Sequence, residues 1–142
     1  MITANRYHDI SVGHRVYGHE SKCAHFHGHN YRIHFSIAPQ AGAGLDGIGR
    51  VIDFSVIKSV LCEWLEQNWD HKFLIWEEDP HAIALQEMDR QGVVIFPLNP
   101  TAENMAWYLM DAIAPPLLRG LGVQLVECTI EETRKCSVTY KL

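Results

Sequence analysis

The chain has 142 residues, of which 47% are hydrophobic and 20% charged, and its formal net charge is −5. This length is typical of one globular domain, so we expect a single domain over residues 1–142. The acidic balance argues against a nucleic-acid-binding protein. No segment approaches the roughly 18 apolar residues of a membrane span, so we expect no membrane association.

The four cysteines stand far apart in the sequence and form no C-x-x-C pair. This spacing argues against a Cys-rich zinc ribbon and against a disulfide framework. The first residues also lack the apolar region of a signal peptide. We therefore expect free thiols and a cytoplasmic location.

Alternating apolar and polar residues predict two strands in the first third of the chain, over 7–16 and 29–37. In the first strand His14 falls on the apolar side. When the alternation of the second strand is extended backwards, His27 and His29 fall on its apolar side as well. The sequence therefore predicts three inward-facing histidines on two successive strands.

A glycine-rich turn region precedes the first predicted helix. Asp53 or Ser55 can cap this helix, and apolar residues continue at three- and four-residue spacing as far as Trp69. A short helix over 80–90 and a strand over 92–97 follow.

Thr101 opens a second long helix, and we expect Pro115 and Pro116 to end or kink it. Residues 122–140 predict a pair of strands. Strands at both ends of the chain with helices between them predict an α+β fold, with helices on one side of an antiparallel sheet.

His27-Gly28-His29 is the strongest local signal for chemistry. Residues i and i+2 of a strand project to the same side, so these two imidazoles can bind one metal ion. With His14 they make three imidazoles and leave a fourth position open, which is typical of a catalytic zinc site. The alternative is that they are ordinary core or surface histidines.

Three further features have both a catalytic and an ordinary interpretation. Cys23 is a zinc ligand, a base or nucleophile, or a small buried hydrophobe. Asp70-His71 is either an oriented acid–base pair or a charged helix end. Glu132 is either a carboxylate on the inward face that binds a ligand or, if the strand register slips by one, a surface residue.

Six segments resemble, in order and approximate spacing, the motifs of the 6-pyruvoyl-tetrahydropterin synthase family, which includes the 6-carboxy-tetrahydropterin synthases of queuosine (7-deazaguanine) biosynthesis. Residues 23–31 (CAHFHGHNY) are similar to C-x-x-x-H-G-H-x-[YF]. The other segments are residues 49–54 (G-x-V-x-D-F), 69–74 (L-D-H-x-x-L), 100–104 (P-T-[AS]-E-N), 131–140 (E-T…Y), and 10–14, where ISVGH stands in place of F-x-A-A-H.

The resemblance implies roles for the residues singled out above. His14, His27 and His29 would be the zinc ligands. Cys23 would be the general base, tuned by Asp70 and His71. Glu132 and Thr101 would anchor the pterin. It also implies the tunnelling fold, a four-stranded antiparallel sheet with two main helices on one face. Such chains assemble into a barrel, commonly a hexamer with active sites between subunits.

The implied reaction is the zinc-dependent conversion of 7,8-dihydroneopterin triphosphate to 6-carboxy-5,6,7,8-tetrahydropterin. Within the family, the pyruvoyl-forming synthase or a paralogue that processes dihydroneopterin would use the same metal ligands. From other classes, a His₃ zinc hydrolase and a non-catalytic pterin-binding module remain as alternatives.

Overall fold

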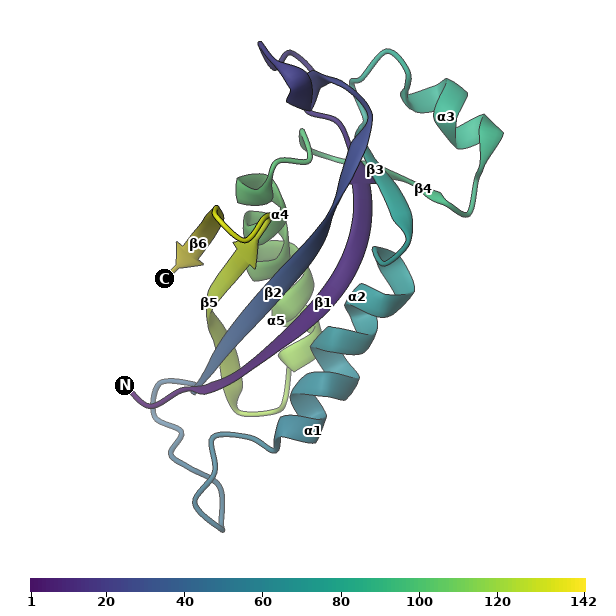
Figure 1. Cartoon of the computed structure of the whole chain (residues 1–142). Coiled ribbons are helices and arrows are strands. Elements are labelled where there is room, and N and C mark those ends of the chain that lie inside the picture. Colours follow the sequence, from purple (N-terminus) through teal and green to yellow (C-terminus); the bar gives the residue numbers. More distant parts are fainter.

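A curved six-stranded sheet with the order β4-β3-β1-β2-β5-β6 forms the centre of the computed structural model, which describes residues 1–142 (Figure 1). The strands are β1 (Ala4–His14), β2 (His27–Pro39), β3 (Lys72–Trp76), β4 (Val93–Phe96), β5 (Val123–Glu131) and β6 (Ser137–Lys141). The sheet has one face covered by helices, here called the inner face, and an opposite, outer face.

The two longest strands, β1 and β2, pair antiparallel along their whole length, from Ala4 opposite Ile37 to His14 opposite His27. Their inward residues are buried, as the alternation predicts: Ile10 and Val12 of β1, and Tyr31, Ile33 and Phe35 of β2. The strand predictions over 7–16 and 29–37 are therefore confirmed, although both strands begin earlier and β1 ends at His14.

The expected four-stranded antiparallel sheet is wrong in two respects. The sheet has six strands, and β3 pairs parallel with both β1 and β4. The sequence did not predict β3 because Leu74 and Ile75, which are adjacent, are both fully buried. A short strand without alternation gives no period-2 signal.

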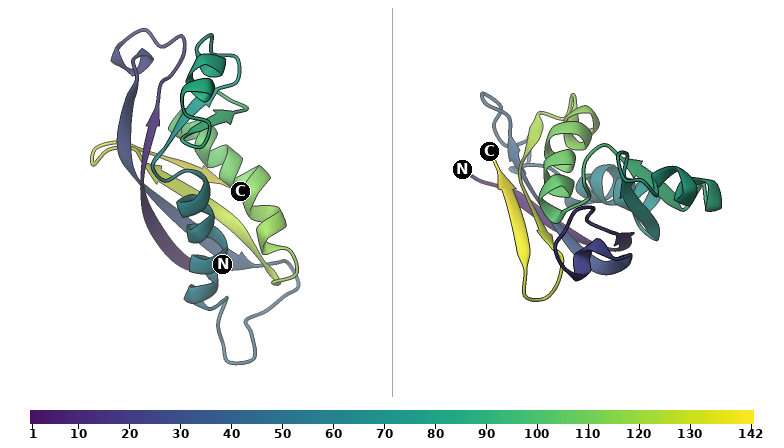
Figure 2. Two further views of the ribbon diagram at one scale, coloured as in Figure 1. Left: turned by 90° about the vertical axis from the view of Figure 1, so that its right-hand side faces the viewer. Right: turned by 90° about the horizontal axis from the view of Figure 1, so that it is seen from above.

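Two helical rods pack against the inner face (Figure 2). The first consists of α1 (Phe54–Ile57), a π-helical turn (Lys58–Cys62) and α2 (Glu63–Asn68); the second of α4 (Ala102–Tyr108), a π-helical turn (Leu109–Ile113) and α5 (Ala114–Leu118). Both predicted caps form. The Asp53 carboxylate accepts a hydrogen bond from the backbone N–H of Ser55 at 2.8 Å, and the Thr101 hydroxyl accepts one from that of Asn104 at 3.1 Å.

Of the two expected effects of Pro115 and Pro116, to end or to kink the helix, the first is wrong, because the rod continues to Leu118. These prolines occupy the first turn of α5, directly after the π-helical turn. Proline is tolerated in a first turn, where its missing N–H has no intrahelical partner to lose.

The remaining elements follow the predicted order. A short 3-10 turn (Lys22–Ala24) lies between β1 and β2, and α3 (Ala82–Met88) lies between β3 and β4. The expected strand pair over 122–140 is the antiparallel pair β5–β6. None of the helices has both the length and the apolar character that crossing a bilayer requires.

Candidate active site

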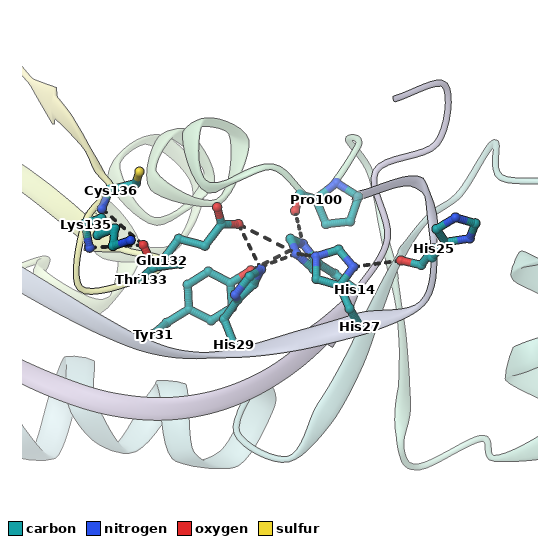
Figure 3. Close-up of polar contacts among 10 residues, drawn as sticks. All are labelled: His14, His25, His27, His29, Tyr31, Pro100, Glu132, Thr133, Lys135 and Cys136. Atoms are coloured by element: carbon teal, nitrogen blue, oxygen red, sulfur yellow. Dashed lines mark hydrogen bonds and ion pairs between the residues drawn. The ribbon is translucent and has the colours of Figure 1, made fainter. Parts of the chain in front are cut away.

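The three inward histidines meet at one end of the inner face (Figure 3). His14 and His27 are direct cross-strand partners, and their Nε2 atoms lie 3.1 Å apart. His29 follows two residues later on the same side of β2. One ring nitrogen from each histidine lies within 4.8 Å of the others, so three imidazole donors converge on one point.

Backbone carbonyls orient two of these rings. Nδ1 of His14 donates to the carbonyl of Pro100 at 2.6 Å, and Nδ1 of His27 donates to the carbonyl of His25 at 2.7 Å. Because a carbonyl only accepts, each bond fixes the proton on Nδ1 and leaves the Nε2 lone pair facing the other imidazoles. A metal-binding histidine typically has such an outer partner.

The third ring has a nitrogen that no protein group satisfies. Nε2 of His29 is buried and has no hydrogen-bond partner. An unsatisfied buried polar atom costs about 1–3 kcal/mol, so its presence calls for a ligand. A metal ion among the three nitrogens would supply that ligand, and three imidazoles are a donor set that Zn²⁺ accepts.

Burial keeps His14 and His29 uncharged. It lowers the pKa of His14 to about 4, against the opposing effect of the bond to Pro100, and it holds the pKa of His29 below its ordinary value. Both imidazoles are therefore neutral near pH 7. The neutral imidazole is the form that binds a metal.

Glu132 extends from the end of β5 toward the cluster, which is the inward one of the two orientations that the sequence left open (Figure 3). Its Oε1 lies 3.5 Å from Nε2 of His29 and 3.7 Å from Nε2 of His14. The β5–β6 turn holds it there, because the N–H of Glu132 donates to the carbonyl of Cys136 at 3.1 Å. The carboxylate is 30% exposed, so a ligand can reach it.

The sequence prediction missed Tyr31 as part of the site. Its hydroxyl lies 3.2 Å from Nε2 of His14. Burial, and after it the negative charges of Glu132 and Cys23, raise the pKa of Tyr31 above its usual range, so the phenol stays protonated. The available signal was its position, two residues after His29 on the inward side of the strand.

Cys23 lies on the 3-10 turn between β1 and β2 and is half-buried. Its carbonyl accepts a hydrogen bond from the N–H of Val16 at 2.8 Å, which closes the loop that carries it. All four cysteines are free thiols, as their spacing predicts.

Asp70 and His71 form the predicted pair, which is attached to Ser11 of β1. Oδ2 of Asp70 contacts Nδ1 of His71 at 2.8 Å, and Oδ1 accepts from the N–H of Ser11 at 2.8 Å. Burial alone would raise the pKa of Asp70. Hydrogen bonds from Ser11 and His71 outweigh this effect and hold the pKa below its usual value. The His71 side chain is 80% exposed and lines a groove with Ser11 and Asn30, which meet on the outer face.

Thr101 lies next to Pro100, whose carbonyl orients His14. Its hydroxyl oxygen already accepts the capping bond of α4 and retains its proton for donation. Contact between Thr101 and a pterin stays a prediction.

Comparison with known proteins agrees with this fold. Residues 3–142 match the family described as 6-pyruvoyl tetrahydropterin synthase. The chain is 34% identical over 139 residues to the 6-carboxy-5,6,7,8-tetrahydropterin synthase of Rickettsia felis, which covers 97% of this chain and 99% of that protein.

Two solved structures share the fold. An uncharacterized protein from Wolinella succinogenes superposes with a TM-score of 0.84 at 20% identity, covering 99% of this chain and 97% of that one. The 6-pyruvoyl tetrahydropterin synthase of Caenorhabditis elegans superposes with a TM-score of 0.68 at 24% identity, covering 99% and 95%. With the match over residues 3–142, these findings show that the chain belongs to the 6-pyruvoyl tetrahydropterin synthase family.

Proposed function

We propose that this protein is a zinc-dependent lyase that converts 7,8-dihydroneopterin triphosphate to 6-carboxy-5,6,7,8-tetrahydropterin, a step of 7-deazaguanine (queuosine) biosynthesis. The observation that carries the proposal is the convergence of three imidazole nitrogens, with the carboxylate of Glu132 3.5 Å from one of them. The name of the Rickettsia felis relative supports the carboxy-forming reaction.

His14, His27 and His29 would hold the metal ion through the nitrogens that face one another. Bound zinc would supply Lewis-acid polarisation of the oxygens on the substrate's side chain. The buried, unpartnered Nε2 of His29 supports this assignment, because a metal bond removes the cost of leaving that atom unsatisfied.

The chain's own residues would bind the pterin and move protons. The carboxylate of Glu132 would accept hydrogen bonds from the amide and guanidine-like edge of the ring, with Thr101 contributing a hydroxyl. Cys23 would take a proton from a side-chain carbon while the electron pair left behind expels triphosphate. In the carboxy-forming reaction a water molecule then adds to the carbon that becomes the carboxyl group, the bond between this carbon and the next breaks, and acetaldehyde leaves.

Asp70 and His71 would tune Cys23 from a neighbouring subunit. Within one chain the pair lines a groove together with Ser11, Asn30 and Glu132, and we propose that it serves the site of the next chain rather than its own. An assembly of several copies, which we propose to be a hexamer, would bring one chain's pair to the next chain's cluster.

Incubation of the purified protein and zinc with dihydroneopterin triphosphate, followed by mass analysis of the pterin product, tests the proposal. We expect the 6-carboxy product together with acetaldehyde. A 6-pyruvoyl product would favour the pyruvoyl-forming synthase instead. Pterin binding without turnover would indicate a binding module and would refute the proposed reaction.

The Cys23→Ala variant separates the lyase from a zinc hydrolase. We expect it to lose turnover and to retain zinc, because Cys23 is not among the three converging ligands. A hydrolase that uses zinc-bound hydroxide would not need this thiol and would keep its activity.

A further inference from the structure

Asp79 is a buried carboxylate that the proposed reaction does not use. His14 and Asp79 are the two buried polar or charged residues of the chain, and Asp79 is 4% exposed. Burying a carboxylate is costly unless it meets opposite charge and donors. Its partners therefore indicate what this residue does.

The partner of Asp79 is Arg15, the first residue after β1. Nε of Arg15 donates to Oδ2 of Asp79 at 2.6 Å, and Nη2 donates to Oδ1 at 2.7 Å. This bidentate pairing is the strongest and most directional form of an arginine–carboxylate contact. Oδ1 also accepts from the N–H of His81 at 2.9 Å, which fixes the carboxylate to the start of α3.

Arg15 in turn contacts both limbs of the loop that carries Cys23. Its guanidinium carbon lies 5.4 Å from the ring centroid of Tyr17, on the limb that leaves β1. It lies 5.3 Å from that of Phe26, on the limb that enters β2. Between them, the N–H of Val16 binds the carbonyl of Cys23 at 2.8 Å.

The pair therefore connects two segments that are far apart in the sequence, the β1–β2 loop and the segment that follows β3. Figure 1 shows both at the same end of the molecule. A second attachment holds only one limb of the loop: the Asn99 side chain accepts from the N–H of Tyr17 at 3.2 Å and donates to its carbonyl at 2.9 Å. The limb that contains Phe26 is linked to Asp79 through Arg15. The Phe26 ring also packs edge-on against Phe73 of β3 and against His81, with ring centroids 5.6 Å and 6.1 Å apart.

We propose that Arg15 and Asp79 are positioning residues, which hold in place the loop that carries Cys23. The proposal rests on the proposed function, in which Cys23 is the base. Neither residue needs to touch the substrate, because both act through the loop.

Two variants test this role, with a third as a matched control. Asp79→Asn keeps the size of the side chain and removes its charge. Arg15→Lys keeps the positive charge and loses the planar guanidinium group that makes the bidentate contact. The control is Asp46→Asn, since Asp46 also pairs with an arginine, Arg50, at 2.8 Å, but in an exposed loop. Each protein is assayed for kcat, KM, zinc content, and the rate at which iodoacetamide alkylates Cys23 relative to the exposed Cys136.

For Asp79→Asn we expect kcat to fall about 10- to 100-fold, since a misplacement of about 1 Å can cost on the order of 100-fold in rate. KM and zinc content should change little, because the residues proposed to bind substrate and metal are untouched. Alkylation of Cys23 should rise several-fold relative to Cys136 as the loop opens. Arg15→Lys should show the same changes to a smaller degree.

The proposal is overturned if Asp79→Asn folds and matches the Asp46→Asn protein in kcat and in the alkylation ratio. If Asp79→Asn does not fold, Arg15→Lys decides by the same two measurements, and wild-type values there overturn the proposal. If the wild-type protein fails to turn over dihydroneopterin triphosphate, the proposed function is refuted. The alkylation ratio still reports whether the pair holds the loop.

Discussion

Replacing His29 by alanine should remove the response of the protein to zinc while leaving its metal-free stability almost unchanged. His29 is the ligand whose Nε2 is buried without a partner. In the absence of metal the substitution loses some packing of a side chain that is 19% exposed. It also removes the unsatisfied nitrogen, which costs about 1–3 kcal/mol, so the two effects largely offset each other.

The response of the wild-type protein to zinc can be estimated. A ligand that binds only the folded state stabilises it by about 2.7 kcal/mol when its free concentration is about 100 times the Kd. For a domain of this length 1 kcal/mol corresponds to about 3 °C in melting temperature. Zinc should therefore raise the melting temperature of the wild-type protein by about 8 °C, and that of His29→Ala by much less.

Thermal unfolding in chelator and in buffered zinc, with metal analysis of the dialysed proteins, measures this difference. The matched control is His34→Ala, since His34 lies on the same strand but on the outer face, where it contacts Glu131. The control should keep the full increase. A three-histidine site is refuted if His29→Ala retains zinc and shows the same increase as the control.

Four further predictions follow from the same geometry. Glu132→Gln should raise KM for the pterin substrate about 10- to 100-fold with a smaller change in kcat, since a hydrogen bond to a charged group is worth about 1.5–3 kcal/mol; steady-state kinetics would contradict this role if KM were unchanged. The pKa of Asp79 lies below its ordinary value of 3.8, because contacts with Arg15 and His81 outweigh its burial. The stability it contributes is therefore present above about pH 4 and lost as the pH falls through the lower, folded-state pKa. Melting temperatures between pH 5 and pH 2.5, a range chosen to span about one pKa unit on each side of 3.8, should fall more steeply for the wild-type protein than for Asp79→Asn, and parallel curves would contradict the assignment. Ile33→Ala, at a fully buried position of the central strand, should lower the free energy of unfolding by about 2–5 kcal/mol in denaturant titrations. Finally, Cys23→Ala and His71→Ala proteins, unfolded and refolded together, should regain up to about a quarter of wild-type activity if each site takes the two residues from different subunits; no recovery would argue that one subunit supplies both.

The sequence predicts the histidine cluster well because strand geometry is local. Alternation along β1 and β2 suffices to place His14, His27 and His29 on one side. The register of the two strands, with His14 opposite His27, then brings the rings together. Glu132 could be placed by the same parity, and its orientation toward the cluster is as expected.

Contacts between segments far apart in the sequence could not be predicted in this way. The parallel pairing of β3 with β1 depends on which segments meet in space, and the fully buried Leu74-Ile75 shows no alternation. The pairing of Arg15 with Asp79 joins residues 64 positions apart, and neither residue belongs to a recognisable pattern. Tyr31 had the right parity, but a tyrosine in a strand is ordinarily a core residue.

The placement of β3 bears on the proposal that Asp70 and His71 serve the site of a neighbouring subunit. Ser11 of β1 binds Asp70 through its backbone N–H, whereas His14 of the same strand orients toward the cluster. Three residues of a strand span about 10 Å, and the groove of His71 lies on the outer face. The acid–base pair is therefore attached to the same strand that carries His14, three residues away along it. A second copy can supply the pair without any change in the fold, because β4 and β6 leave both edges of the sheet unpaired within the chain.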